Sequence, residues 1–471
     1  MRKLLQVFRF SSTGATSYDV TGPLNQDEKV ARTSGGEKQE PLISIERGFI
    51  TNLQNARDSH NYVFIIFMMF GFGALLPWNM FLNISHDYYT SFKLTDGNQN
   101  ATWHSNNFQN AMTISAQIPN VMFSIASIFL ATKGDLTCRM KVCLAVVQLM
   151  VLLTMACIYV ETHTWTSAFF NLTILSIIVL NAACGLFQNS MFGLASSFPF
   201  KYTNAIIIGQ NFCGIVVTVL AILTKVVSDD VQMRAMLFFG ISSIAVITCF
   251  VLLNIITKLD FYRRYGELDT DSDVFDDSDR EATMEVIRAA FSKSKMQFLN
   301  IFLLFFVTLA LFPNICMYVR DLNSENEYSF VLPEVYYMDI CTFLNFNVFA
   351  FLGSLTANWY RLLGPKTIWI AVVARFWFLI YFPAANYLPP GTERLIPVLF
   401  NSTWFFIFNV TVLAFSSGYL SSLIMMYAPK AHEEPKIQRM AGMIAAFFLI
   451  FGILAGLTFS WPIKMIVVGS A

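Results

Sequence analysis

The stretch Tyr62–Ile84, YVFIIFMMFGFGALLPWNMFLNI, decides the class of this protein, because it is long and apolar enough to cross a bilayer. About 20 such residues in a helix span a hydrocarbon layer of ~30 Å. Gly71 and Gly73 remove side chains from one face of this helix. Pro77 lacks a backbone donor, and Asn79 carries an amide that is costly to leave unpaired. Taken alone, these residues are better explained by close helix packing; ten further apolar spans favour a helix that lines a cavity.

The composition is that of a polytopic membrane protein. Hydrophobic residues make up 55% of the chain and charged residues 13%, with 47 phenylalanines. These values exclude a soluble globular protein. A formal net charge of zero predicts no nucleic-acid partner. The sequence has no metal-ligand spacing, catalytic cluster or phosphate-binding loop, so we predict neither an enzyme nor a cofactor.

Long apolar runs predict an all-α protein with eleven transmembrane helices. Their approximate spans are 62–84, 108–131, 140–160, 167–197, 204–226, 235–257, 298–319, 333–358, 366–388, 400–427 and 440–468. An odd number of crossings places the two termini on opposite sides of the membrane.

The distribution of lysine and arginine predicts which side is which. With the N-terminus inside, the short inner loops carry Lys133, Arg139, Lys141, Lys201, Arg361, Lys366, Lys430, Lys436 and Arg439. The long loop 258–297 adds seven more, whereas the outer loops carry only Lys93, Lys225, Arg234, Arg320 and Arg394. This positive-inside bias predicts a cytoplasmic N-terminus and an extracellular C-terminus. The first outer loop then exposes Asn100 in a glycosylation sequon, so the protein is predicted to be a glycoprotein.

The same pattern predicts four segments. They are a flexible cytosolic tail (1–61), an N-terminal bundle of six helices (62–257), a charged cytosolic linker (258–297) and a C-terminal bundle of five helices (298–471). A long linker suits a transporter whose two halves rock against each other. Ser272 and Ser278 among acidic residues fit a disordered or phosphorylated tether equally well.

Charged residues are scarce at membrane depth. Arg375 is the one basic residue predicted in mid-membrane, and Asp339, near the outer end of its helix, is the comparable acid. Carriers driven by protons or sodium need buried carboxylates or an ion cage, so we predict no ion coupling. Arg375 must face the bundle or a wet cavity. Pairing with backbone carbonyls is slightly favoured over a role in substrate binding.

Neutral polar and aromatic residues instead recur at helical spacing. The stripes are Thr113, Gln117 and Asn120; Asn181, Gly185 and Gln188; and Phe343, Asn347, Phe351 and Ser354. One such stripe is more often an interhelical hydrogen bond than a pathway. Several stripes in both halves favour a pathway for a neutral, flat solute, because amides pair with base edges and hydroxyls while Trp78, Phe312 or Phe343 can stack on a ring.

Several motifs resemble those of the equilibrative nucleoside transporter family. They are LLPWN (Leu75–Asn79), LFQNSMFGLASSFP (Leu186–Pro199), GQNFCG (Gly209–Gly214), FNVFAFLGSLTA (Phe346–Ala357), FSSGYLSSL (Phe415–Leu423) and AGMIAAFF (Ala441–Phe448). The resemblance covers essentially the whole chain after residue 60. It implies a fold similar to the major facilitator architecture in a six-plus-five arrangement, and passive, bidirectional movement of nucleosides.

The resemblance also implies a set of substrate contacts. Carried over by position, these are Leu75, Trp78, Leu82, Gln117, Asn120, Gln188, Phe312, Phe343, Asn347 and Ile453, with Asn79, Ser354 and Arg375 as polar or charged support. The family's eighth span usually carries an Asp and, one turn later, an Arg. Here these positions read Ala350 and Ser354. Either Arg375, Gln117 or Asn120 compensates for the lost charges, or the permeant is something other than a ribonucleoside.

We therefore predict a facilitative carrier of nucleosides, and of nucleobases as a second substrate class, working by alternating access in the bilayer. Two alternatives stay open. One is a receptor or scaffold that recruits partners through the loop 258–297, and the other is a proton-coupled or organic-cation carrier that uses Asp339. The plasma membrane is preferred to an endolysosomal membrane, because no acidic dileucine signal precedes Leu42. The oligomeric state and the preferred base are left open.

Overall fold

Long apolar helices make up the structure, a computed structural model that describes residues 58–96, 100–130, 135–227, 230–270, 280–319, 328–389 and 392–469. The predicted tail lies outside these residues as far as residue 57, and so do residues 271–279 of the predicted linker. The described residues form no β-strand beyond three isolated bridges. The predicted all-α fold is confirmed.

The N-terminal half contains six long helices. These are α3 (Tyr62–Ile84), α4 (Trp103–Leu130), α5 (Leu136–Ala156), α6 (Thr166–Ser196), α7 (Phe200–Val227) and α8 (Val231–Ile256). A short 3-10 turn, Ser59–Asn61, precedes α3, and the π-helical segment η3 (Ser85–Lys93) continues it. We call α3 to α8 the N-half.

The C-terminal half is less regular. It contains α10 (Arg280–Leu311), α12 (Asn345–Trp359), α15 (Thr403–Lys430) and α16 (Pro435–Val468) as its long helices. Between them lie the 3-10 turn Cys316–Tyr318 and four short helices: α11 (Glu334–Tyr337), the π-helical η5 (Met338–Leu344), α13 (Ile368–Ala374) and α14 (Trp377–Ala384). We call α10 to α16 the C-half.

Several helices begin at residues whose side chains cap free backbone amides. The Asp58 carboxylate accepts hydrogen bonds from the amides of Val63 and Phe64, both at 3.1 Å. Asp135 and Asp230 cap α5 and α8 in the same way. An acidic side chain suits a helix N-terminus because it satisfies donors and complements the helix dipole.

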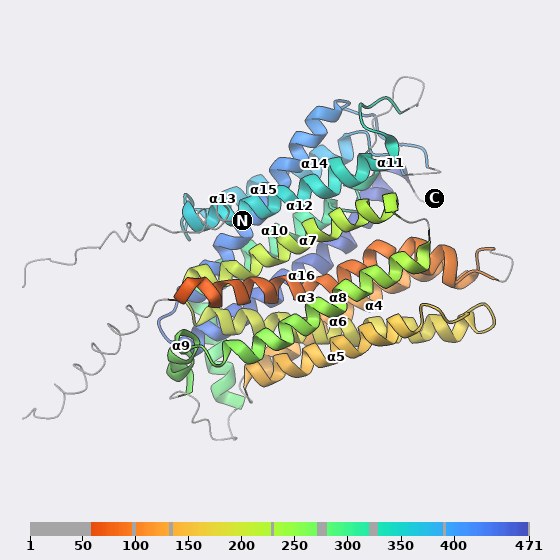
Figure 1. The fold of residues 1–471 in the computed structure, drawn as a ribbon. Coiled ribbons are helices and arrows are strands. Elements are labelled where there is room, and N and C mark those ends of the chain that lie inside the picture. The colour runs from red at the N-terminus through yellow and green to blue at the C-terminus, as the bar shows by residue number, and fades with distance from the viewer. Residues whose placement is uncertain are drawn as a thin grey trace, which may run out of the picture. The chain divides into compact units, whose positions relative to one another are not determined.

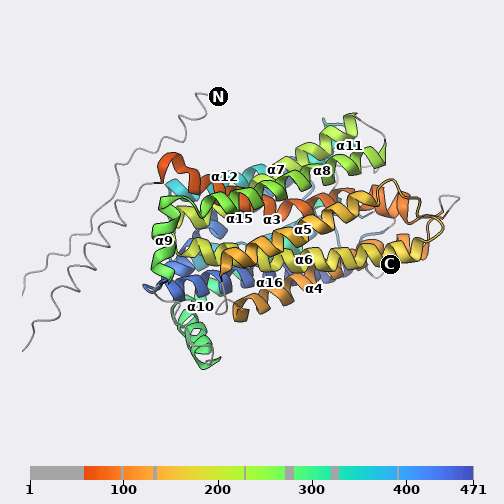
Figure 2. The ribbon, with the colours of Figure 1, turned by 60° about the horizontal axis from the view of Figure 1, so that its bottom comes forward.

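The helices pack in a consistent pattern within and between the halves. In the N-half, α3 packs on α7 and α8, α4 on α6, and α5 on α6 and α8. In the C-half, α10 packs on α16 and α15, and α12 packs on α15. The halves meet where α7 contacts α12 and α15, and where α16 contacts α4 and α6. Figures 1 and 2 show α9 (Asp260–Thr270) at one end of the long helices and α11 at the other. We refer to these as the α9 end and the α11 end.

Close approach of α3 and α7 depends on glycine. A Cβ built on Gly71 would overlap the carbonyl oxygen of Ile206, and one on Gly209 would overlap that of Met68. Small residues allow helix backbones to come this close, which is how membrane helices gain packing energy without a hydrophobic driving force between them.

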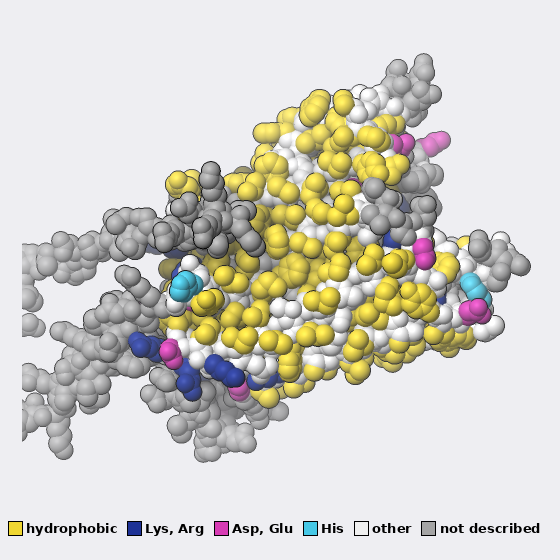
Figure 3. Space-filling model, viewed as in Figure 1, with side chains coloured by type: hydrophobic (Ala, Val, Ile, Leu, Met, Phe, Trp, Pro, Cys, Tyr) yellow, Lys and Arg dark blue, Asp and Glu magenta, His cyan; other side chains and the backbone are white. Residues whose placement is uncertain are grey.

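The surface matches a position within lipid. Hydrophobic side chains cover the middle of the face seen in Figure 3, and lysine and arginine gather close to α9. Exposed large hydrophobic residues, such as Leu149, Ile244 and Trp461, occur along several of the long helices. A soluble protein would not expose so much apolar surface.

Ten helices in the described part of the chain are long and apolar enough to span a membrane. The ninth predicted span, 366–388, is the exception. The chain there forms the shorter apolar segment Ile368–Ala384, which breaks between α13 and α14 at Arg375. The count of eleven spans therefore stays a prediction.

The predicted linker contains helical structure. α9 docks through aromatic side chains, because Tyr265 and Tyr262 stack on Phe198 at centroid distances of 5.0 and 5.6 Å. α10 begins at Arg280, well before the predicted start of the seventh span at 298. The described part of the predicted linker is therefore mostly helical, and α9 is packed against the protein through its aromatic side chains.

Candidate functional site

The predicted amides of α4 and α6 flank one contact between these two helices in the N-half. Asn120 sits against Gly185, since a Cβ added there would come within 2.6 Å of the Asn120 Oδ1. Gln117 lies one turn before Asn120 on α4, and Gln188 lies one turn after Gly185 on α6. Gln117 is 8% exposed and Gln188 is 5% exposed.

The register of these two helices is fixed by a reciprocal pair of hydrogen bonds. Ser124 Oγ donates to the Asn189 Oδ1 at 3.0 Å, and Asn189 Nδ2 donates to the Ser124 carbonyl at 2.8 Å. Both residues are fully buried. This pair holds Asn120 opposite Gly185 and leaves the neighbouring Gln188 free to point elsewhere.

Within the described residues, the side chains of Gln117, Asn120 and Gln188 make no hydrogen bond, and the first two carry an oxygen that is also closed off from solvent. The Gln117 Oε1 and the Asn120 Oδ1 are completely enclosed. Leaving such a group unpaired costs about 1–3 kcal/mol. Amides that carry this cost in a native structure point to a ligand or a water molecule that supplies the missing partner.

Gln210 on α7 is a fourth amide of this kind, and the sequence analysis did not single it out. Its Nε2 is enclosed and without a partner in the described part of the chain. At 100° per residue, Gln210 faces away from Val219 and Leu223, which are exposed on the outer side of α7. The signal that could have found it is its place in GQNFCG, between two glycines of the motif.

Aromatic side chains gather in the C-half. Phe312 follows directly after α10 and stacks on Phe346 with a centroid distance of 3.8 Å. Phe343, in η5, meets Phe312 edge to face at 5.5 Å. The structure therefore brings these two predicted contacts together. Ile453, half-buried on α16, follows Gly452, where α16 lies against the backbone of Phe302 on α10.

Asn347 takes part in a contact between the halves. Its Nδ2 donates to Thr218 Oγ1 on α7 at 3.1 Å, and its Oδ1 lies against Gly214. A substrate contact by Asn347 would have to share or replace this bond. Ser354 is fully buried and donates to the carbonyl of Phe351 in its own helix.

Further polar contacts continue this line along both helices. Asn204 Nδ2 donates to the Ser354 carbonyl at 2.9 Å, and Asn211 Nδ2 donates to the Ala350 carbonyl at 3.4 Å. At the α11 end, Lys225 Nζ lies 2.6 Å from the Asp339 Oδ2. We call these three contacts, together with the bond between Asn347 and Thr218, the α7–α12 seam. Its residues on α7 recur every seven positions, at Asn204, Asn211, Thr218 and Lys225.

The predicted residues of α3 differ in their surroundings. Leu75 and Trp78 are partly buried against the main core, and Asn79 contacts the Cys213 thiol at 3.7 Å. Leu82 is 42% exposed at the end of α3. Its carbonyl accepts a hydrogen bond from Ser85, the first residue of η3.

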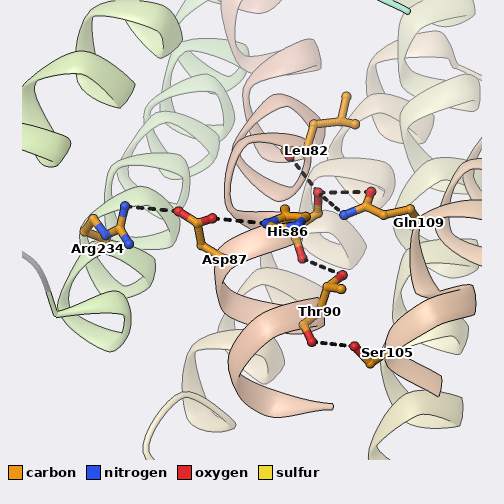
Figure 4. Close-up of polar contacts among 8 residues, drawn as sticks. Leu82, His86, Asp87, Thr90, Ser105, Gln109 and Arg234 are labelled. Carbon is orange, nitrogen blue, oxygen red and sulfur yellow. Dashed lines mark hydrogen bonds and ion pairs between the residues drawn. The ribbon is translucent and has the colours of Figure 1, made fainter. Parts of the chain in front are cut away.

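Polar contacts fix η3 beyond Leu82, as Figure 4 shows. Gln109 of α4 bonds Ser85, while Asp87 pairs with Arg234 of α8 at 3.2 Å. His86 lies beside Asp87 at 3.4 Å. This network joins α3, α4 and α8 at the α11 end and lies within the N-half.

Arg375 is buried in the C-half, as the sequence predicted for a charge at this depth. Its guanidinium donates to the Leu413 carbonyl at 3.0 Å, to the Thr308 hydroxyl at 2.6 Å and to the Ser416 hydroxyl. The aromatic ring of Phe378 lies 6.0 Å from it. All of these partners are neutral, and they link the break between α13 and α14 to α10 and α15.

Two cavities lie away from the predicted contacts. The larger, about 190 Å³, is an apolar groove between α7 and α8 lined by Leu220, Leu223, Thr224, Leu237, Phe238 and Ile241. The smaller, about 10 Å³, is lined by residues of η3, α5 and α6, including Tyr88 and Thr154. Neither cavity touches a predicted substrate contact.

Comparison with known proteins decides the family. The model of the family described as nucleoside transporter matches residues 174–465, more than half of the chain. This chain belongs to the nucleoside transporter family.

Relatives of this family match over most of their length. Equilibrative nucleoside transporter 3 of Rattus norvegicus is 26% identical over 430 residues, covering 86% of this chain and 89% of the relative. Equilibrative nucleoside transporter 1 of Homo sapiens is 27% identical over 470 residues, covering 89% of this chain and all of the relative. Members of the family are transporters and not enzymes, as predicted.

Solved structures confirm the predicted major facilitator fold. The proton:xylose symporter of the major facilitator superfamily gives a TM-score of 0.57 at 11% identity, covering 86% of this chain and 89% of that chain. The fucose:proton symporter of E. coli gives a TM-score of 0.55 at 12% identity, covering 85% and 90%. These similarities concern the arrangement of helices alone.

Proposed function

We propose that this protein is a facilitative carrier that moves nucleosides, and nucleobases as a second substrate class, by alternating access. The observation that carries the proposal is a set of enclosed amide atoms without a partner among the described residues, on Gln117, Asn120 and Gln210. The side chain of Gln188 makes no hydrogen bond there either. A nucleoside supplies both donors and acceptors on its base and its sugar. Its flat ring also suits the aromatic residues Phe312 and Phe343 of the C-half.

The remaining predicted contacts complete this proposed site. Leu75, Trp78 and Leu82 would supply apolar surface from α3, Ile453 would do so from α16, and Asn347 would join when its bond to Thr218 is shared. Ala350 and Ser354 leave no charge beside the sugar. We propose that the neutral amides of the N-half take over this recognition, with Arg375 as structural support through its bonds to Thr308 and Leu413.

Transport is proposed to be independent of ion gradients. Asp339 is the one buried carboxylate among the described residues, and it pairs with Lys225 at 2.6 Å. An ion-driven carrier needs a carboxylate that exchanges its proton or cation with water during each cycle. A carboxylate held in an ion pair is poorly suited to that exchange.

We infer the orientation from the basic residues that gather close to α9 in Figure 3. This end is proposed to be cytosolic, with the N-terminus inside, the C-terminus outside and the plasma membrane as the site of action. The N-half and the C-half would be the two moving bundles, joined by the segment 258–297. Asn100, exposed at the α11 end, is the proposed glycosylation site.

Uptake into proteoliposomes tests the proposed function. Purified protein in vesicles without ion gradients should admit labelled uridine, adenosine or a purine base, in a saturable manner, until the inside and outside concentrations are equal. An imposed proton or sodium gradient should leave this plateau unchanged. Absence of uptake above empty vesicles for every nucleoside and base would refute the proposal, and accumulation driven by a gradient would refute its facilitative part.

A further inference from the structure

The ion pair between Lys225 and Asp339 is unusual in its surroundings. It joins the end of α7 to η5, and therefore the N-half to the C-half. The Asp339 side chain is 8% exposed and that of Lys225 is 34% exposed. Two further ion pairs, those of Asp87 with Arg234 and with His86, lie within the N-half, where Asp87 is 47% exposed. A carboxylate as buried as Asp339 depends strongly on its single partner.

The pair also stands at a defined place on its helix. Phe343 follows Asp339 by four residues, and Asn347 follows Phe343 by four more. Residues at this spacing share one face of a helical segment, although the π-helical turns of η5 shift the angle somewhat. Asp339 is fixed by Lys225 and Asn347 is fixed by Thr218, both on α7. Phe343 is therefore held between two anchors on the same neighbouring helix.

Phe343 has no polar group of its own that could fix its position. It is half-buried and meets Phe312 edge to face at 5.5 Å. Aromatic pairs of this kind hold a ring only weakly. The helix carrying it begins with the short α11 and the π-helical η5, a rare geometry that often occurs at functional sites.

We propose that Lys225 and Asp339 are positioning residues that register η5 on α7 and thereby hold Phe343 at the outer side of the substrate pathway. The existence of a substrate pathway rests on the proposed function, whereas the placement of Phe343 by the ion pair does not. Under it, the pair acts on substrate affinity through Phe343 and neither carries a proton nor touches the substrate.

Uptake kinetics test the proposal with two single substitutions, an exchange of the two charges and a control. Asp339→Asn and Lys225→Gln should each raise KM for uridine about tenfold, because each leaves the partner charge without compensation. The exchange of charges, Lys225→Asp with Asp339→Lys, should restore KM to within about threefold of the original. Arg234→Gln breaks an ion pair that lies within the N-half, between α8 and η3, and is the matched control; KM should not change.

A double-mutant cycle separates positioning from general destabilisation. In a Phe343→Ala background, adding Asp339→Asn should leave KM unchanged, because the ring through which the pair acts is already missing. Independent addition of the two effects would overturn the proposal, as would an unchanged KM in both single variants. Should Asp339→Asn fail to fold, Lys225→Gln in the same Phe343→Ala background carries the same test, since it breaks the same ion pair.

A second measurement does not depend on uptake. Alkylation of Phe343→Cys by a water-soluble maleimide should become about fivefold faster when Asp339→Asn is added, and slow down again in the exchanged pair. An identical rate in all three proteins would overturn the positioning role. If the wild type moves no nucleoside while this rate responds as expected, the proposed function fails and the placement of Phe343 by the pair stands.

Discussion

At the scale of single residues, the amides of Gln117, Asn120, Gln188 and Gln210 make no side-chain hydrogen bond within the described residues and are the proposed substrate contacts of the N-half. Gln188→Ala should raise KM for uridine about tenfold, which corresponds to about 1.4 kcal/mol and lies within the usual cost of an unpaired polar group. Gln117→Ala and Gln210→Ala should act in the same direction. The measurement is concentration-dependent uptake, corrected for the amount of folded protein.

Gln148 offers a control for this series. It is also an amide between helices, and its Oε1 too is enclosed without a partner among the described residues, but its Nε2 donates to Ser243 Oγ at 2.7 Å, which places it between α5 and α8. Gln148→Ala should therefore leave KM unaltered, whatever it does to stability. If Gln117, Gln188 and Gln210 variants behave like Gln148→Ala, these amides serve packing and the pathway must run elsewhere.

His432 should make the protein sensitive to acid. Burial lowers the pKa of His432 below its ordinary value of 6.5; Lys293 lowers it further, while the Ala290 backbone and Glu434 oppose the shift. Below that pH the unfolded chain binds a proton that the folded chain does not yet bind. The free energy of unfolding therefore falls as the pH falls through 6.5.

A neutral replacement tests this prediction. His432→Gln keeps a hydrogen-bonding group near Ser294, which lies 3.0 Å from the histidine ring, but it does not titrate. Between about pH 7.5 and about pH 5.5, the melting temperature of the wild type in detergent should drop more than that of the variant. Parallel curves for both proteins would show that other groups set the acid response.

At the scale of helices, α3 and α7 should tolerate no added bulk between them. Gly209→Ala places a methyl group on the carbonyl oxygen of Met68, and backbone can yield only by separating the helices. The expected loss is about 1–3 kcal/mol of stability. The readout is the melting temperature in detergent.

Gly240 provides the opposite case on a neighbouring helix. A Cβ there meets nothing within 4 Å, and the residue lies in the middle of α8. Gly240→Ala should raise stability by roughly 0.5–1 kcal/mol, because alanine loses less backbone entropy in a helix. Equal melting temperatures for the two variants would mean that the α3–α7 contact is looser than described.

The sequence predicted the long helices well and the irregular ones poorly, for a physical reason. Apolar length is enough to identify α3 to α8, but it does not show where a helix breaks. The break at Arg375 depends on acceptors at Thr308 and Leu413, which lie on other helices. The π-helical segments η3 and η5 likewise depend on tertiary packing rather than on local pattern.

The candidate site shows the same division. Helical spacing indicated the amides of α4 and α6, because their stripe is visible in a single helix. It did not reveal that Asn347 bonds Thr218 on another helix, nor that Gln210 lacks a partner. Whether a polar side chain is free or occupied is a property of its neighbours in space.

At the scale of the whole molecule, the two halves are closely apposed at the α9 end. A Cβ on Gly442 of α16 would overlap the hydroxyl of Ser196, the last residue of α6. Lys430 Nζ donates to the Ser196 carbonyl at 3.0 Å. If alternating access separates the halves here, a covalent link between Ser196 and Gly442 must stop the cycle.

Cysteines at these two positions test this. The variant Ser196→Cys with Gly442→Cys should lose uridine uptake on oxidation and regain it on reduction. Gln148→Cys with Ser243→Cys links α5 and α8 within the N-half, so oxidation there should have little effect. Full uptake by the oxidised Ser196–Gly442 protein would mean that this end stays closed throughout transport.

The hydrogen bonds of the α7–α12 seam also determine which residues of this protein can change in sequence during evolution. Asn204 and Asn211 bind the main-chain oxygens of Ser354 and Ala350, and every amino acid supplies such an oxygen. Substitutions of Ser354 and Ala350 can therefore change the size or charge of the side chain, within the available space, while their backbone carbonyls still accept these hydrogen bonds. The polarity next to Asn347 can change in this way during evolution while the hydrogen bonds between the two halves are kept.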